Sequence, residues 1–261
     1  NISLVGPMPT VVHDAAITYA DKQRLNPAAS YFESRNIKEQ ARIKFANLFG
    51  ANANEVSLLF STSDAENIVT DSLDLKPGDN VVVDQLHFAT TFVLYRNLEA
   101  TKGIELRIVP HVNGQARIED FEARVDARTR IISVAWVSNR NGYRHDLKSL
   151  AELAHRHGGY LFADGIQCFG TFPVNLHDLG VDFACGNSYK YLLSSWGAAP
   201  FYIREEHLDL IVPDRFGHNQ VAESLPDFHF KLEQTAAKYE HAGLIYGTVA
   251  QLSAALGYIS Q

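Results

Sequence analysis

The stretch LAELAHRHGGYLFADGIQCFG, residues 150–170, decides the fold class. Its first half repeats apolar residues at helical spacing and ends in cationic residues and two glycines, which suits the negative end of a helix. Its second half is a short apolar run that ends at Asp164, as a buried strand does before a loop. A helix followed directly by a buried strand is the repeating unit of a parallel sheet. His155 and His157, at the end of the helix, are expected to be solvated.

The same alternation of apolar runs and amphipathic stretches extends from about residue 52 to residue 205. The strand candidates are VSLLF near 56, VVVD near 81, ELRIV near 105, IISVAWV near 131, YLFAD near 160, VDFACG near 181 and AAPFYI near 198. The sequence therefore predicts an α/β fold with a mostly parallel seven-stranded sheet and helices on both faces.

Two regions lie outside this alternation. Upstream, Ile37, Ala41, Phe45 and Leu48 recur on one helical face, and Gly50 follows as a C-terminal stop, which predicts a packing helix. From about 206 to 240 the pattern loosens, which fits a long excursion over the sheet or a linker to a second lobe. A last helix is predicted from about residue 244.

Composition narrows the possible partners. The 261 residues carry a net charge of -7, with lysines and arginines scattered among acids, which argues against binding nucleic acid. No apolar run approaches the roughly 20 residues that span a bilayer, so no membrane partner is expected. Cys168 and Cys185 are too far apart for metal-ligand spacing, and we expect both to be buried packing residues. No metal site is predicted, and a reducing compartment, the cytoplasm, is expected.

In open α/β sheets, ligands bind beyond the carboxyl ends of the strands. Lys190, in CGNSYKYLLSSWG (185–197), follows one strand candidate, and Asp164 ends another. An amine at such a place can form a Schiff base, while a buried carboxylate at a neighbouring strand end can hold a pyridinium nitrogen protonated. The pairing suggests pyridoxal phosphate chemistry. Taken alone, the two residues could also be a surface lysine and a helix-capping aspartate.

Two further strand ends carry suitable groups. After VSLLF, Ser63 and Glu66 have capping-box spacing, and the backbone amides of Ser63, Asp64 and Ala65 would open a helix that can hold phosphate. After VVVD, His87 or Phe88 could stack on a flat cofactor ring. A capping box that binds nothing and a core aromatic are the ordinary alternatives.

The ends of the fourth and fifth strand candidates add amide side chains. Asn139 could donate to a phenolate oxygen, although a loop-capping asparagine would look the same. Gln167 lies three residues beyond Asp164, so both side chains could face one ring. Asp164 could instead bind magnesium for a nucleotide. Neither GxxxxGK[ST] nor GxGxxG occurs in the chain, which weakens that alternative.

Taken in order, these groups resemble the aminotransferase class V family of pyridoxal phosphate enzymes. The resemblance covers almost the whole chain and is closest to the branch of isopenicillin N epimerase-like proteins, carbon–sulfur lyases and cysteine desulfurases. It rests on GPMP, NPAASYFESR, LLFSTSDAENIV, HFA, VSN, LAELAHRHGGYLFADGIQCFG, FPVNLHDLGVDF and SYKYLL. It implies an N-terminal segment at 1–30, a cofactor-binding large domain at 31–240, and at 241–261 the start of a helix leading to a small C-terminal domain that the sequence lacks.

The resemblance also implies a role for each site residue and a homodimeric assembly. Lys190 would hold the cofactor and act as the catalytic base, Asp164 would pair with the pyridine nitrogen, and His87 would stack on the ring. The remaining cofactor contacts would come from Ser63, Asp64, Ala65, Asn139, Gln167, Asn187 and Tyr189. Arg140, Tyr143 and Arg144 are the nearest candidates for substrate contacts.

The chain departs from the family at the positions that would bind the cofactor's phosphate. Asn187 and Tyr189 stand where the family often has serine and histidine before the lysine, and Asp64 places a carboxylate near a dianion, so its side chain must point away. Ala242 and Gly243 replace a glycine and threonine, of which the threonine would reach the partner subunit's phosphate.

The implied reaction begins at the α-carbon of an amino acid or its thioether conjugate. The leading hypothesis is β-elimination at a carbon–sulfur bond through an α-carbanion. The alternatives are transamination or epimerisation and, from another class, a non-catalytic relative that keeps the fold as a structural or binding partner.

Overall fold

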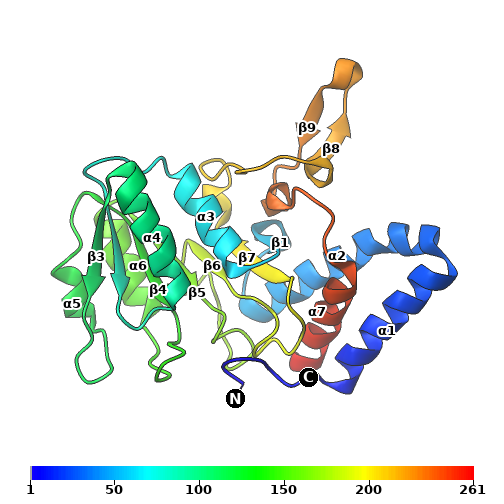
Figure 1. Ribbon diagram of the computed structural model, residues 1–261, viewed down its shortest axis with the longest axis horizontal. Coiled ribbons are helices and arrows are strands. Elements are labelled where there is room, and N and C mark those ends of the chain that lie inside the picture. Colours follow the sequence, from blue (N-terminus) through cyan, green and yellow to red (C-terminus); the bar gives the residue numbers. More distant parts are fainter. Residues whose placement is uncertain (1) are drawn as a thin grey trace.

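All seven predicted strands are present in the computed structural model, which describes residues 2–261 (Figure 1). They are β1 (Val56–Leu59), β2 (Asn80–Asp84), β3 (Glu105–Val109), β4 (Thr129–Ala135), β5 (Tyr160–Asp164), β6 (Phe183–Cys185) and β7 (Ala199–Ile203). They form one sheet in the order β1-β7-β6-β5-β4-β2-β3, in which β7 runs antiparallel to both of its neighbours and the other pairs are parallel. The predicted α/β class and mostly parallel sheet are confirmed.

Helices cover both faces of the sheet, which is why its strands are apolar on both faces. On one face, Val81, Val83 and Ile131 pack with α3 (Thr62–Ser72) and α4 (Ala89–Lys102). On the other, the alternate residues, such as Val82 and Ile132, share a core with other helices. These are α2 (Pro27–Phe49), α5 (Ile118–Glu122), α6 (Leu147–Arg156) and α7 (Tyr246–Ile259). Cys168 and Cys185 are fully buried, as predicted.

The first and last helices pack together beside the sheet (Figure 1). The predicted packing helix is α2, and it ends where Gly50 adopts a left-handed φ of 63°. Both α2 and α1 (Thr10–Leu25) contact α7. The boundary suggested at residue 30 lies inside α2, which spans Pro27–Phe49. The division into 1–30, 31–240 and 241–261 stays a prediction. None of the described helices is long and apolar enough to cross a membrane.

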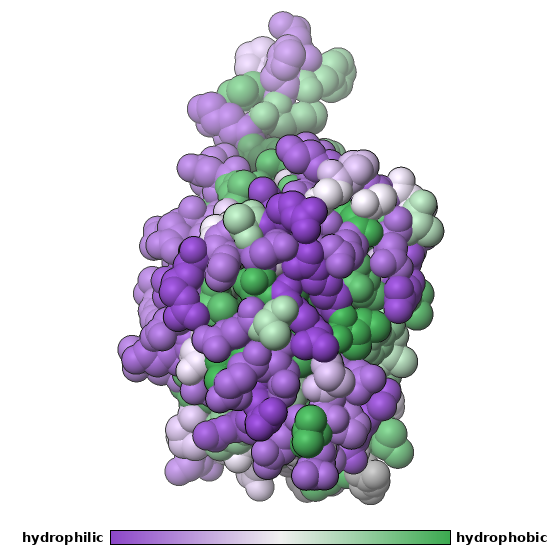
Figure 2. All heavy atoms as spheres, turned by 90° about the vertical axis from the view of Figure 1, so that its left-hand side faces the viewer, coloured by the Kyte–Doolittle hydropathy of each residue, from purple (hydrophilic) through white to green (hydrophobic). Residues whose placement is uncertain are grey.

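The loosely patterned region 206–240 contains a two-stranded hairpin, β8 (Val221–Ser224) with β9 (Phe230–Leu232), that projects from the body (Figure 1). One short 3-10 turn, His218–Gln220, precedes β8, and another, Pro226–Phe228, joins the two strands; a further turn, Glu205–His207, lies upstream, directly after β7. A fourth, Ala236–Tyr239, leads towards α7. Figure 2 shows the hairpin standing above a face of the molecule that carries mainly hydrophilic side chains. The region is therefore an excursion from the sheet.

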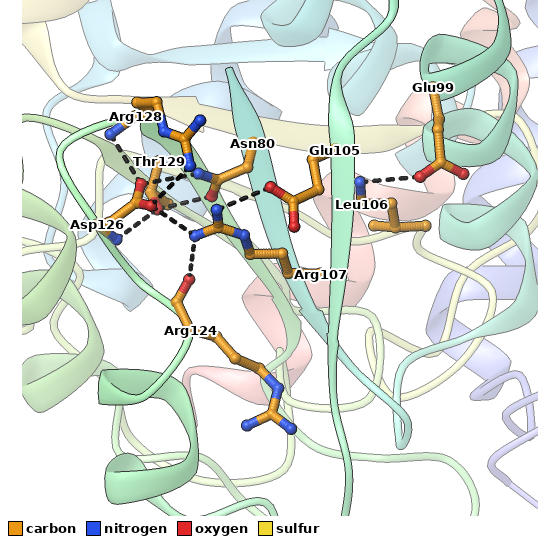
Figure 3. Close-up of polar contacts among 9 residues, drawn as sticks. All are labelled: Asn80, Glu99, Glu105, Leu106, Arg107, Arg124, Asp126, Arg128 and Thr129. Carbon is orange, nitrogen blue, oxygen red and sulfur yellow. Dashed lines mark hydrogen bonds and ion pairs between the residues drawn. The ribbon is translucent and has the colours of Figure 1, made fainter. Parts of the chain in front are cut away.

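Ion pairs close the amino ends of β2, β3 and β4 (Figure 3). The guanidinium of Arg107 donates to Asp126 at 2.9 Å and to Glu105 at 2.8 Å. Burial raises the pKa of the Asp126 carboxyl, but hydrogen bonds from the Arg128 amide and from Arg107 outweigh it and hold this pKa well below its usual range. The charged groups at the amino ends of these strands thus pair with one another, and the carboxyl ends of the strands are left for a ligand.

The expectation that His155 is solvated is confirmed, since its side chain is 42% exposed, but its ring also has a buried partner. Its Nε2 lies 2.8 Å from Oδ2 of Asp182, a buried carboxylate that also contacts His207 Nε2 at 2.7 Å and accepts from the Leu161 amide. The hydrogen bond with Asp182 raises the pKa of His155, against burial, which lowers it. This contact ties the end of α6 to the start of β6.

We predict that this ion pair makes stability depend on pH. Because the pKa of His155 is higher in the folded than in the unfolded chain, its contribution is complete below about pH 6.5, the unfolded value, and is lost as pH rises through the folded pKa. In urea denaturation, His155→Asn should remove this pH-dependent part, about 0.5–1 kcal/mol. His157→Asn is the control, and the same pH profile in wild type and His155→Asn would contradict the prediction.

Candidate active site

A pocket of about 210 Å³ opens where the carboxyl ends of the parallel strands meet. It brings together seven of the predicted residues: Ser63, Asn139, Asp164, Gln167, Asn187, Tyr189 and Lys190. Residues that the sequence reasoning did not place there complete the wall: Ser61, Thr62, Glu66, Thr90, Thr91, Ala135, Val137 and Ile166, with Phe88, which had been an alternative to His87.

Lys190 is a buried amine in this pocket, with 7% of the residue exposed. Its Nζ lies 5.8 Å from the ring centroid of Phe88 and 5.7 Å from that of Tyr189, which stacks on Trp196. Burial lowers the pKa of Lys190, and the charge of Asp164 opposes that change. A lowered pKa lets the amine spend more time neutral, the form that can act as a nucleophile or a base.

Asp164, at the end of β5, is the matching carboxylate. One oxygen accepts from the Ile166 amide at 2.9 Å, and 7% of the residue is exposed. Burial raises the pKa of Asp164, while a positive charge on His87, the Ile166 amide and Lys190 would act in the opposite direction. A cationic group in the pocket would favour the ionised carboxylate. Gln167 lies on the next turn of the chain and lines the same pocket.

The helix start after β1 lies earlier than predicted. Helix α3 begins at Thr62, and its cap is Ser61, whose hydroxyl accepts from the Asp64 amide at 3.2 Å. Asp64 does not line the pocket; its carboxylate accepts from Ser61 Oγ at 2.8 Å, and it borders a separate cavity with Arg215. Ala65 is fully buried. Ser61, Thr62 and Ser63 therefore form the pocket end of the helix, and counting from the end of β1 would have found the first two.

The aromatic wall is Phe88 and not His87, because the turn after β2 buries His87 behind the pocket. His87 is 1% exposed and does not line the pocket, whereas Phe88 does and is 46% exposed. The expected stacking role of His87 is therefore replaced by Phe88, which follows it directly.

The three candidates for substrate contacts lie outside the pocket. Tyr143 donates to the Ala116 carbonyl at 2.9 Å, and the guanidinium of Arg144 lies 4.9 Å from the ring centroid of Phe172. Arg140 is exposed. Among residues 2–261, no arginine or histidine lines the pocket, and Lys190 is its one basic side chain.

The N-terminal segment supports the Lys190 loop. The Gly6 amide donates to the Tyr189 carbonyl at 2.8 Å, and a Cβ on Gly6 would lie 2.0 Å from the Lys190 carbonyl oxygen. The segment also touches Gln167, whose side-chain amide donates to the Ser3 carbonyl at 3.1 Å. A residue without a side chain is required at position 6 for the segment to lie this close.

The donor set fits pyridoxal phosphate. A helix start with free amides suits a phosphate, and the Thr62 side chain at this helix start also lines the pocket. A carboxylate, an amine and an aromatic wall suit a basic ring, and Lys190, Asp164 and Phe88 supply them. The pocket can therefore hold the cofactor that the sequence resemblance implies.

We predict that Gly6→Ala destabilises the chain by about 1–3 kcal/mol, because the added methyl forces the segment away from the Lys190 loop. The measurement is the free energy of unfolding in denaturant. The matched control is Gly247→Ala in α7, where a Cβ makes an ordinary 3.7 Å contact with Tyr19 and a gain in helix propensity is expected. Equal stability of Gly6→Ala and wild type would show that the close approach is not required.

Known proteins resemble this chain in sequence and in fold. Among curated proteins, the chain is 33% identical over 175 residues to an uncharacterized aminotransferase of Bacillus subtilis, covering 67% of this chain and 46% of that protein. It is 29% identical over 228 residues to a cysteine desulfurase of Klebsiella pneumoniae, covering 85% of this chain and 56% of that protein. The chain thus spans about half the length of these curated relatives.

Solved structures share the fold. The complex of a cystine C–S lyase with its product cysteine persulfide superposes with a TM-score of 0.92 at 21% identity, covering 100% of this chain and 71% of that one. The apo cysteine desulfurase of Thermococcus onnurineus gives 0.86 at 24% identity, covering 100% and 66%. The family model described as aminotransferase class V matches residues 7–261. The chain belongs to the aminotransferase class V family.

Proposed function

We propose that this chain is the cofactor-binding part of a pyridoxal phosphate-dependent enzyme that acts on an amino acid. The observation that carries the proposal is the meeting of Lys190 and Asp164 in one pocket beside a helix start. The amine's pKa is lowered by burial and the carboxyl's is raised by burial, which is the pattern of groups with a chemical task.

Each residue has a definite part in the chemistry. When bound, pyridoxal phosphate supplies an electron sink for negative charge that develops at the substrate α-carbon. Lys190 would hold the cofactor at Nζ and, as a neutral amine, would remove and return the substrate α-proton. The Asp164 carboxylate would pair with the ring nitrogen, Phe88 would cover one ring face, and the amides of Thr62 and Ser63 would bind the phosphate.

The reaction we propose is β-elimination at a carbon–sulfur bond. A cysteine conjugate loses its α-proton to Lys190 and its thiol as the leaving group; with one water, the products are the thiol, pyruvate and ammonia. The support is the similarity to cysteine desulfurases and to the fold of a cystine C–S lyase. A desulfurase also needs a nucleophilic cysteine, and burial raises the pKa of both Cys168 and Cys185, so neither suits that role.

Transamination and epimerisation are the alternatives, because both begin with the same proton transfer at Lys190. A non-catalytic relative is the alternative of another class; the phosphate end of the pocket, which lacks arginine among residues 2–261, motivates it. A homodimer and a cytoplasmic location complete the proposal; the homodimer rests on the family resemblance, and the location rests on the small number of cysteines.

We predict that the protein binds pyridoxal phosphate covalently at Lys190. The loaded protein should be yellow, and borohydride should fix the cofactor on the tryptic peptide that contains Lys190, detected as a mass shift. Lys190→Ala should abolish the trapped product, and Lys148→Ala, an exposed lysine of α6, should leave it unchanged. A colourless protein with no saturable cofactor binding would favour the non-catalytic alternative.

The reaction type is tested by product analysis with a cysteine thioether as substrate. Pyruvate and ammonia released in equal amounts are expected for β-elimination. A new keto acid with the amine retained on the cofactor would assign a transaminase, and loss of optical activity alone would assign an epimerase.

A further inference from the structure

A chain of buried polar side chains runs behind the pocket wall, between α3 and the turn after β2. Glu66 is 5% exposed, and its two carboxylate oxygens accept from the Ser133 hydroxyl at 2.7 Å and from the Thr91 hydroxyl at 2.9 Å. Ser133 Oγ in turn lies 3.4 Å from Nε2 of His87. Ser133 and His87 are 0% and 1% exposed, so solvent does not compete for these contacts.

The neighbours of His87 select one form of its ring. Nδ1 of His87 lies 2.7 Å from the Phe88 amide, which donates to it, so Nδ1 carries no proton. The proton is then on Nε2, where it faces Ser133 Oγ. The Ser133 hydroxyl donates its hydrogen bond to Glu66, so its oxygen is left to accept one from His87. The contacts are mutually consistent when His87 is neutral with its proton on Nε2.

The last contact in this series of buried side chains is with Phe88, the aromatic wall of the site. The amide that His87 accepts belongs to Phe88, whose ring centroid lies 5.8 Å from Lys190 Nζ. The side chain of Phe88 is itself 46% exposed, so its backbone contacts have a large share in holding it. A histidine that took up a proton at Nδ1 would lose the Phe88 amide.

We propose that Glu66, Ser133 and His87 are positioning residues that act through Phe88: Glu66 orients the Ser133 hydroxyl, which fixes the tautomer of His87, which holds the Phe88 backbone. The proposal deepens the proposed function, on which it rests, by assigning a task to three buried residues, of which Glu66 lines the pocket and Ser133 and His87 do not. It also accounts for a second carboxylate in the pocket wall besides Asp164.

The charged and titratable groups around these three side chains come from three other parts of the fold. Asp164 faces it from β5, and Glu66 is among the groups that raise the pKa of that carboxyl, after burial. Tyr95 faces it from α4, with its pKa raised by burial and then by Glu66. Lys190 and Tyr189 lie across the pocket.

The first test is a double-mutant cycle on cofactor binding. Ser133→Ala should weaken the equilibrium Kd for pyridoxal phosphate by about three- to tenfold through looser placement of the ring. In a Phe88→Ala background, the same substitution should change Kd by less than about twofold, since the residue through which it acts is gone. Additive effects of Ser133→Ala and Phe88→Ala would overturn the proposal.

The matched control is Ser57→Ala. Ser57 is also a fully buried serine on a strand, β1, and its hydroxyl has no hydrogen-bond partner among the described residues. It should leave Kd unchanged in both backgrounds. A loss of affinity as large as that of Ser133→Ala would mean that any buried serine matters, and would count against a specific chain.

The second test uses the cofactor-free protein, so its result is independent of the proposed function. Long-range proton–nitrogen NMR of labelled histidine should show His87, assigned by its loss in His87→Gln, as the neutral form protonated on Nε2. Ser133→Ala should give mixed tautomers or an imidazolium, and Ser57→Ala should not. An imidazolium or Nδ1-protonated His87 in the wild type would overturn the proposal, whereas failure to bind pyridoxal phosphate with the expected tautomer present would overturn only the proposed function.

Discussion

The rest of the site depends on a carboxylate and an amine that are buried in the same pocket. Burial acts on Asp164 and Lys190 in opposite senses, raising one pKa and lowering the other, and so favours the neutral form of both groups. Each also lowers this cost for the other through its charge. A ligand with a basic ring nitrogen and an aldehyde would give both groups a partner, which is why these two residues point to one cofactor class.

The parallel sheet brings Asp164 and Lys190 into one pocket, and the sequence predicts this sheet. In β5 every position but the last is apolar, and in β2 every position but the first and the last; such runs between amphipathic stretches belong to a sheet covered on both faces. The hairpin of β8 and β9 was not readable. Its residues are mostly exposed, so no buried face imposes a periodic pattern on them.

The site was predictable to within two residues at the helix start and to within one at the aromatic wall. The capping-box spacing of Ser63 and Glu66 predicts a helix start at Ser63, but Ser61 caps the helix and Glu66 turns inward to Ser133. It chose His87 over Phe88 for the wall, and the turn after β2 reverses the two. Periodicity shows where a strand ends, but the dihedral angles of the turn decide which of two adjacent side chains faces the ligand.

The distribution of charge in the pocket also orients a ligand. The helix start follows β1, whereas Asp164 ends β5, three positions away in the sheet order, so the positive end of α3 and the carboxylate approach the pocket from different sides. A phosphate at the Asp164 side would meet a negative charge, and a cationic ring at the helix start would meet a positive dipole end. Asp64, the carboxylate nearest the helix start, is drawn aside by Ser61 and does not cancel this polarity. The pocket therefore favours one direction of binding for a molecule with a phosphate at one end and a basic ring at the other, and that direction brings the ring to Lys190.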